Sequence, residues 1–356
     1  MIESLIDIYG DGTVLMMGGL AVGILFGAAA QHSRFCLRAA TVEVSAGTFG
    51  PRLSIWLVAF FSAMTIVQAL IAGGWLDVTQ SRQLATTGSL SGAIIGGLLF
   101  GAGMILARGC ASRLLVLSAT GNLRALLTGL VLTLVAQSAL RGALAPARDA
   151  IARLWLIPGG EARSLLAKFG LTSGVVATLG AAALLLSLGL AWRRGVRITH
   201  ILAAALVGLA VALGWAATYA VAQVSFEVIP IASVTFTGPA TDTLMGLVNT
   251  TTLPLGFGVG LVPGVFIGSA TAAILAGEFR IQRFGADTPM ERYLVGAVLM
   301  GFGAMLAGGC AVGAGMSGGA ILALTAWVAV FFMWVGAMAT QIALGRRGGA
   351  ANPAAG

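Results

Sequence analysis

The chain contains three cysteines, Cys36, Cys110 and Cys310, and each follows a glycine-studded apolar run. A thiol is soft and polarizable, so it can contact a sulfur atom in a ligand or, once ionised, act as a nucleophile. The cysteines are separated by 73 and 199 residues, without any C-x-x-C pair. This spacing argues against a zinc knuckle or a thioredoxin-type pair, and a disulfide joins at most two of the three. We therefore expect no metal and no cofactor.

The cysteines occupy corresponding points of an internal repeat. Residues 96–111 and 296–311 align at an offset of 200, and nine of the sixteen pairs are identical. Residues 23–36 match residues 97–110 without a gap, and both have G-x3-G followed by R-x-C. An isolated cysteine in a membrane helix is usually a small buried apolar residue, but three at matching positions favour a common role. Helices interrupted at each cysteine predict thiols that face something crossing the membrane.

Arginines flank the first two cysteines. Arg34 and Arg108 each precede a cysteine by two residues, and Arg38 and Arg113 follow within three. A guanidinium at the end of an apolar run snorkels to the interface, pairs with an acid or binds an anion. A half-helix starting after Cys110 would direct its first N–H groups at the same place, which favours an anion or a thiolate.

The third cysteine loop has no arginine and is instead rich in glycine from Gly308 to Gly319. Free backbone amides without side chains suit the close approach of an anion. The candidate substrate-binding residues are the cysteines with the adjacent arginines and glycines: Cys36, Cys110, Cys310, Arg34, Arg108, Gly109, Gly308 and Gly309. We expect no catalytic residue, because no acid, base or metal constellation and no Walker motif accompanies them.

The amino-acid composition indicates that the protein is surrounded by lipid rather than by water. Hydrophobic residues make up 58% of the chain, charged residues 9%, and the mean hydropathy is +0.98, which leaves too little polar surface for a water-soluble globule. Apolar stretches near the 20 residues that cross a bilayer recur along the chain. They predict an all-α polytopic membrane protein with about nine transmembrane helices plus re-entrant or half helices. The five longer ones are 54–75, 123–140, 172–192, 198–224 and 319–344, and the four shorter, glycine-interrupted ones are 14–30, 91–107, 254–276 and 292–307.

The net charge of +8 is mostly a topology signal. The acidic first 13 residues lack the basic start of a signal peptide, so the first helix is expected to be retained. The turn containing Arg193, Arg194 and Arg197 and the segment with Arg346 and Arg347 are expected on the cytoplasmic side. No basic stretch interleaved with aromatic residues indicates nucleic-acid binding.

The repeats suggest one membrane domain with two pseudo-symmetric halves, about 1–145 and 245–345, joined by connecting spans at about 146–244. A degenerate fourth copy at 260–264 would place Ala273 at the cysteine position. The Thr-, Ser- and Pro-rich segment 225–252 predicts a polar loop or re-entrant segment. Within it, Asp242 is more typical of a helix cap than of a substrate gate. His32 and Glu43 lie near Cys36 without a defined role.

At these motifs the chain resembles the YeeE/YedE family of sulfur-compound transporters. The resemblance covers most of the chain, through Arg34-Phe35-Cys36, Arg108-Gly109-Cys110 and the run from Gly308 to Gly318. It implies an inverted-repeat, hourglass-shaped protein of the bacterial inner membrane, in which Cys36, Cys110 and Cys310 pass thiosulfate along by S–H···S contacts. It also implies a TusA-like sulfurtransferase partner on the cytoplasmic side. Some relatives are associated with selenium.

The leading hypothesis is thus a permease for thiosulfate or a related sulfur oxyanion, and not an enzyme. A transporter of another sulfur or selenium species is one alternative. A membrane sulfurtransferase, in which one cysteine carries a persulfide, is another, and it requires an activated thiol and a resolving partner. A purely structural protein leaves the repeated Gly-Cys turns unexplained.

Overall fold

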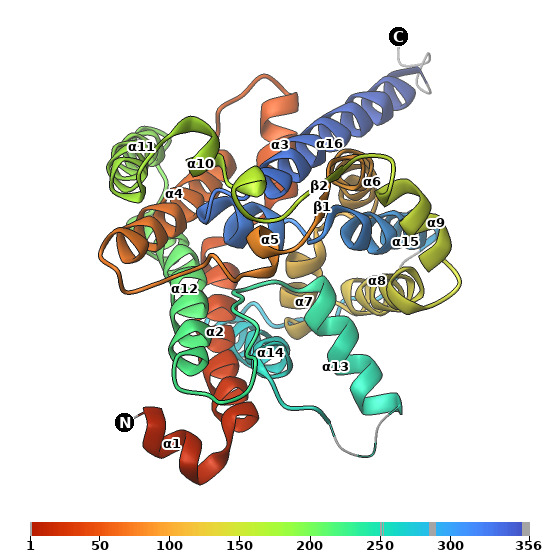
Figure 1. Cartoon of the computed structure of the whole chain (residues 1–356). Helices are drawn as coiled ribbons and strands as arrows, with labels where there is room; N and C mark the ends of the chain where they lie inside the picture. Colours follow the sequence, from red (N-terminus) through yellow and green to blue (C-terminus); the bar gives the residue numbers. More distant parts are fainter. Residues whose placement is uncertain (1, 250, 252, 285–289, 351–356) are drawn as a thin grey trace.

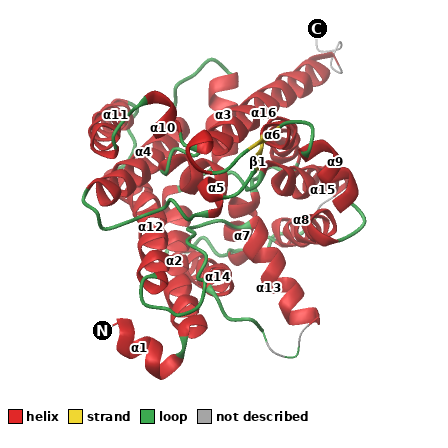
Figure 2. Ribbon diagram, viewed as in Figure 1, coloured by secondary structure: helices red, strands yellow, loops and turns green. Residues whose placement is uncertain are grey.

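A computed structural model describes residues 2–249, 251, 253–284 and 290–350, and helices dominate it (Figures 1 and 2). Nine segments of the described chain are long and apolar enough to cross a membrane. This confirms the predicted all-α polytopic membrane protein. The helices that form these segments are α2 (Asp11–Ser33), α4 (Pro51–Ala72), α6 (Leu90–Leu106), α8 (Leu123–Arg141), α11 (Ser173–Arg193), α12 (Ile198–Ala222), α14 (Phe257–Leu275), α15 (Met290–Ala307) and α16 (Leu324–Ala350).

Short helices extend or connect these spans. Those next to the cysteines are α3 (Leu37–Ser45), α7 (Ala111–Ala119) and a π-helix, η2 (Gly313–Gly318). The segment predicted to be re-entrant forms a loop followed by α13 (Thr237–Asn249). The remaining elements are α1 (Ile2–Tyr9), α5 (Arg82–Ala85), β1 (Gly88–Ser89), α9 (Ala145–Ala152), β2 (Leu156–Ile157), η1 (Gly160–Arg163) and α10 (Leu165–Phe169), with β1 and β2 paired antiparallel.

The last span starts later than the apolar pattern predicts. Hydropathy places its start at residue 319, whereas α16 begins at Leu324. The intervening residues are fully packed and complete the loop after Cys310. Hydropathy does not separate a buried apolar loop from a helix, which explains the difference.

Glycines allow α2 and α14 to run side by side in the same direction. Gly19 packs on the backbone of Phe257 and Gly27 on that of Val265, so positions along both helices rise together. A Cβ atom on either glycine would collide with the carbonyl oxygen of its neighbour. Close backbone approach of this kind is how helices associate without large side chains in lipid. We call this contact the glycine seam.

The two most similar repeat segments, α6 and α15, instead pack antiparallel. Gly96 contacts Gly303, and Gly103 contacts Gly296, where an added Cβ would lie 2.6 Å from the carbonyl oxygen of the partner glycine in both cases. The glycines shared by the two copies are therefore the residues at which the copies meet. An inverted relation between two copies gives this antiparallel arrangement.

Helix directions divide the charged residues between two faces. Helices α2, α6 and α14 end at one face, where α12 and α15 begin. We call it the arginine-rich face. Among the residues whose side chains are described, its acids are Glu43, Glu278 and Glu291, and its arginines are Arg34, Arg38, Arg52, Arg108, Arg113, Arg124, Arg193, Arg194, Arg197, Arg280, Arg283 and Arg292. The opposite, mixed-charge face carries Arg82, Arg141, Arg148, Arg153, Arg163 and Lys168 together with Glu3, Asp7, Asp11, Asp77, Asp149, Glu161, Glu227 and Asp242.

Candidate functional site

The cysteines lie where helices break, as the repeat predicts. Helix α2 ends at Ser33, and Cys36 is the N-cap residue of α3; Cys110 is likewise the N-cap residue of α7. The residue two positions before each cysteine has a left-handed backbone: φ is 55° at Arg34, 56° at Arg108 and 78° at Gly308. Three copies therefore share one backbone break. An arginine in this conformation is strained by about 1–2 kcal/mol, whereas a glycine adopts it freely.

All three thiols are free and buried. The exposed fraction is 9% for Cys36 and 1% for both Cys110 and Cys310. Cys110 and Cys310 belong to one continuous apolar core, and Cys36 is buried between two members of that core, Phe35 and Leu37, rather than on the lipid-facing surface. A thiol on the lipid side would show a large exposed fraction, so this placement is compatible with an internal role.

Cys36 and Cys110 are neighbours in space. Their side chains lie close enough to interact, and Cys110 Sγ also lies 3.3 Å from Ser112 Oγ. Arg113, from α7, donates to Gln31 Oε1 of α2 at 3.4 Å, which ties the two breaks together. The first two repeat copies therefore combine into one thiol pair.

Cys310 has polar neighbours of its own. The backbone N–H of Gly313 donates to Cys310 Sγ at 3.4 Å, and Thr235 Oγ1 lies 3.8 Å from the same sulfur. Gly313 has no side chain, and a Cβ there would collide with the Thr235 side chain. Glycine is thus needed for the threonine hydroxyl to reach the thiol. The adjacent backbone is fixed by Ser317, which donates to the Val234 carbonyl at 2.6 Å.

A row of aromatic rings links the two thiol regions. Phe236 follows Thr235, its ring centroid is 5.1 Å from that of Phe26, and Phe26 is 6.4 Å from Phe35, the neighbour of Cys36. Phe26 and Phe236 are fully buried. The material between Cys310 and the Cys36–Cys110 pair is therefore dry and aromatic.

A cavity of about 750 Å³ opens on the mixed-charge face and extends to Thr235. It lies between the start of α2, the end of α8, α13 and the loop before α13. Its charged lining residues are Asp11, Arg141, Glu227 and Asp242. We call this cavity the vestibule. It leads from the surface to the immediate surroundings of Cys310.

The predicted arginines have different surroundings. Arg34 is half-exposed and pairs with Glu278, with 3.1 Å between Nη2 and Oε1. Arg108 lines a smaller cavity on the arginine-rich face. Arg34 is therefore partly neutralised by an acid, while Arg108 faces an open space.

The glycines predicted to bind the substrate also differ in their surroundings. Gly109 packs against the Leu114 side chain and Gly309 against the backbone of Ala314, whereas a Cβ on Gly308 would meet nothing within 4 Å. The carbonyl of Gly308 accepts a hydrogen bond from Arg82 Nη2 at 3.3 Å. A guanidinium from a distant segment thus stands beside the one cysteine break that lacks its own arginine.

Sequence reasoning missed three residues of this site: Arg82, Thr235 and Phe236. Arg82 belongs to no repeat and meets Gly308 only in the folded chain, so no local pattern indicates it. Thr235 and Phe236 lie in the segment that the Thr, Ser and Pro content had singled out as polar. That signal located the segment without indicating which side chain reaches Cys310.

Three further expectations are resolved by their contacts. Asp242 is not a helix cap, because it lies in the interior of α13. Glu43 accepts hydrogen bonds from the N–H groups of Arg52 and Leu53 at 3.1 and 2.9 Å, so it caps the start of α4. Ala273 lies inside α14, which continues to Leu275, so the proposed fourth copy has no helix break at the position that corresponds to the cysteine. The described residues contain no group of three potential metal ligands.

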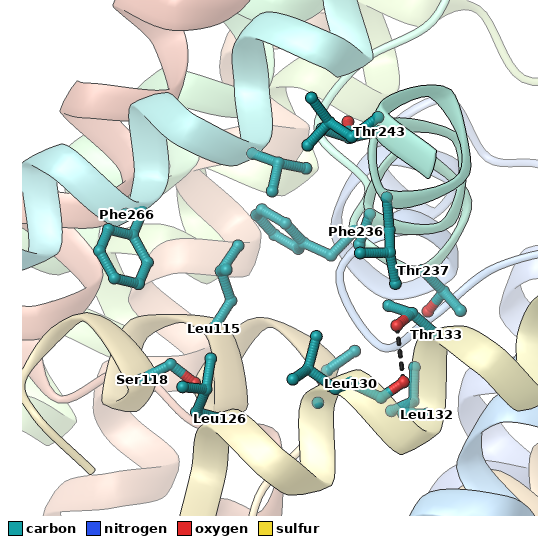
Figure 3. Close-up of a pocket in the computed structure, with 16 residues that line it drawn as sticks. Leu115, Ser118, Leu126, Leu130, Leu132, Thr133, Phe236, Thr237, Thr243 and Phe266 are labelled. Carbon is teal, nitrogen blue, oxygen red and sulfur yellow. Dashed lines mark hydrogen bonds between the residues drawn. The ribbon is translucent and has the colours of Figure 1, made fainter. Parts of the chain in front are cut away.

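A third, largely apolar pocket lies beside the thiol pair between α7, α8, α13 and α14 (Figure 3). Leu115, Phe236 and Phe266 surround it, and the described lining includes no charged side chain. Apart from the hydroxyls of Ser118, Thr133, Thr237 and Thr243, this lining is apolar, and it offers a dianion no opposite charge to compensate for its lost hydration. The pocket is therefore unsuited to a charged ligand.

The fold and the site define a multi-pass membrane protein with three buried thiols at repeated helix breaks. The sequence model of the family described as sulphur transport matches residues 32–339 of this chain. The chain therefore belongs to the sulphur transport family, which agrees with the YeeE/YedE resemblance.

Two named relatives are similar over nearly their whole length. The thiosulfate transporter TsuA of Escherichia coli (strain K12) is 29% identical over 348 residues, which cover 90% of this chain and 92% of the relative. The thiosulfate transporter TsuA of Spirochaeta thermophila is 27% identical over 339 residues, which cover 89% and 96% of the two chains.

Proposed function

We propose that this protein is a permease of the bacterial inner membrane for thiosulfate or a closely related sulfur oxyanion. The anion enters the vestibule, contacts Cys310, passes the aromatic row and reaches the Cys36–Cys110 pair. The observation that carries the proposal is the placement of three buried thiols in a core that separates the vestibule from an arginine-lined cavity on the other face. The names of the two relatives support the choice of thiosulfate.

Soft sulfur contacts supply the selectivity. Thiosulfate presents a polarizable terminal sulfur, whereas sulfate presents only hard oxygens, and thiols interact favourably with polarizable groups. The N–H of Gly313 and the hydroxyl of Thr235 offer donors beside Cys310. The approaches to the thiols are shaped by Arg108, Gly109, Gly308 and Gly309. At the arginine-rich face, Arg34 contributes by exchanging its contact with Glu278 for one with the anion.

The arginine-rich face is assigned to the cytoplasm by the positive-inside bias. On this face a small TusA-like sulfurtransferase is the expected partner, because it would receive the anion where the path ends. The antiparallel contact of α6 and α15 supports two inverted halves at about 1–145 and 245–345, joined by 146–244.

The test replaces one thiol at a time. Cys110→Ser and Cys310→Ser keep size and a hydrogen-bond donor but remove the soft sulfur, so uptake of sulfane-labelled thiosulfate into vesicles is expected to fall by at least about tenfold. Ser112→Ala, which alters only a neighbour of Cys110, is the matched control. Unchanged uptake in both cysteine variants at normal expression contradicts the thiol path. Selenite and sulfate as competitors distinguish thiosulfate from the alternative of another sulfur or selenium species.

The proximity of Cys36 and Cys110 favours a second candidate function, a membrane sulfurtransferase. In that reaction a thiolate attacks the sulfane sulfur of thiosulfate, the S–S bond breaks, sulfite leaves with the electron pair, and the cysteine becomes a persulfide. Mass spectrometry during turnover separates the two functions. A stoichiometric persulfide that an acceptor thiol removes supports the sulfurtransferase, while a permease shows none.

A further inference from the structure

A cavity of about 280 Å³ on the arginine-rich face is lined by hydrogen-bond donors. It lies where α6 ends and where α8 and α15 begin. Its polar side chains are Arg38, Arg108, Asn122, Arg124 and Tyr293, and no carboxylate is among its described lining residues. Asn122 Nδ2 and Arg124 Nη2 donate to Gln282 Oε1 at 2.8 and 3.1 Å. The guanidinium groups of Arg38 and Arg108 with the Tyr293 phenol form a donor set that matches an oxyanion.

Three arginines at or beside this cavity, Arg38, Arg108 and Arg292, bring like charges close together. Arg38 is close enough to Arg108 and Arg292 for their like charges to act on it. The Nε atoms of Arg38 and Arg292 are buried and have no hydrogen-bond partner among the described residues. The two ion pairs formed within the described ranges, Arg34–Glu278 and Arg148–Asp149, leave these arginines out. Partly buried like charges are costly unless an anion joins them.

We propose that this cavity is a second anion site, which binds a tetrahedral oxyanion with two negative charges and recognises it only through its oxygen atoms. The thiols of Cys36 and Cys110 are not among its lining residues, so no soft contact distinguishes thiosulfate from sulfate here. Sulfate therefore binds this site about as well as thiosulfate, in contrast to the thiol path. Its consequence for uptake rests on the proposed function: sulfate on the arginine-rich side occupies the exit and slows thiosulfate transport.

Binding is tested on the purified full chain in detergent with inorganic sulfate as the probe. Calorimetry is expected to detect sulfate binding, and Arg38→Gln and Arg124→Gln are each expected to weaken it about tenfold, as for the loss of a charge-assisted hydrogen bond. Arg124→Lys keeps the charge and is expected to retain part of the affinity. The matched control is Arg153→Gln, an exposed arginine on the opposite face. Cys36→Ser is expected to leave sulfate affinity unchanged.

Thiosulfate uptake by proteoliposomes, with and without sulfate inside, is measured on the same preparations, and circular dichroism confirms that each variant is folded. Sulfate affinity that is equal in wild type, Arg38→Gln and Arg124→Gln overturns the site. Loss of sulfate binding in Cys36→Ser also overturns it, since the anion would then occupy the thiol path. A wild type that transports thiosulfate but binds no sulfate refutes the second site alone. Sulfate binding without thiosulfate transport refutes the permease alone.

Discussion

At the scale of single residues, three copies of one backbone break carry two different residue types at the left-handed position. Arg34 and Arg108 occupy the left-handed position in the first two copies, and Gly308 occupies it in the third. The missing guanidinium at Gly308 is replaced by that of Arg82, which reaches the Gly308 carbonyl from the start of α5. An arginine thus lies at all three breaks. In the first two copies it is part of the break, and in the third it comes from a segment distant in the sequence.

Arg82→Gln is expected to reduce thiosulfate uptake about fivefold, because a cation beside the Cys310 break attracts the approaching dianion. The effect should shrink as ionic strength rises, since Arg82 is exposed to solvent. Uptake is measured against Arg153→Gln, another exposed arginine of the mixed-charge face that lines neither cavity. Equal uptake by the two variants shows that Arg82 only supports the Gly308 loop.

The sequence predicts the residues that belong to a repeat and misses those that tertiary structure brings in. Cys36, Cys110 and their arginines follow from aligned copies within one chain. Arg82 is 226 residues from Gly308, and Thr235 is 75 residues from Cys310. No local spacing encodes either contact. The role of Glu43 was likewise not predictable from the sequence, because the start of α4 meets Glu43 only in the folded chain.

At the scale of elements, α13 determines the character of the vestibule. This helix has 13 residues, too few to cross a bilayer, and it carries Asp242 into the vestibule wall. Burial raises the pKa of Asp242, while the charges of Arg141 and Arg82 oppose that shift. The carboxyl therefore takes up a proton at a higher pH than a free aspartate does.

This shift predicts a pH dependence of uptake. As pH falls through the raised pKa, Asp242 becomes neutral, repulsion of the dianion weakens, and uptake is expected to rise. Asp242→Asn is neutral at every pH, so its uptake near pH 7 is expected to exceed that of wild type about threefold and to change less on acidification. Initial rates between about pH 5 and pH 8 give the comparison. Glu161→Gln, an acid of the same face outside the vestibule, is the control, and an identical profile for Asp242→Asn and wild type contradicts the assignment.

Elements were predictable where hydropathy and length agree. The nine apolar segments correspond to the nine candidate spans, and the break at Cys110 is where α7 begins. Helix α13 was not identified as a helix, because its threonines, glycines and Pro239 are typical of loops. Its packing against α8 and α14 overrides those preferences. The same misjudgement made Asp242 look like a cap.

At the scale of the whole molecule, charge is divided between the two faces, and this division predicts the orientation in the membrane. A cysteine introduced at Arg194, on the arginine-rich face, is expected to react with a membrane-impermeant maleimide only after cells are lysed. A cysteine at Trp75, which is 77% exposed on the opposite face, is expected to react in intact cells. The native thiols are buried and provide a low background. The reverse labelling pattern would place the vestibule in the cytoplasm and invert the direction of the proposed path.

The glycine seam between α2 and α14 limits how the protein moves during transport. Because backbone lies directly on backbone at Gly19 and Gly27, the two helices have no layer of side chains that rotamer changes can rearrange. Sliding one past the other by a turn would drive larger residues into the contact, so the pair moves as one rigid body. Opening between Cys310 and the thiol pair must then come from small local motions, such as rotation of the Phe26 and Phe236 rings and displacement of α13. The protein is thereby expected to conduct its anion with an almost static scaffold, more like a narrow channel with side-chain gates than like a transporter whose halves rock.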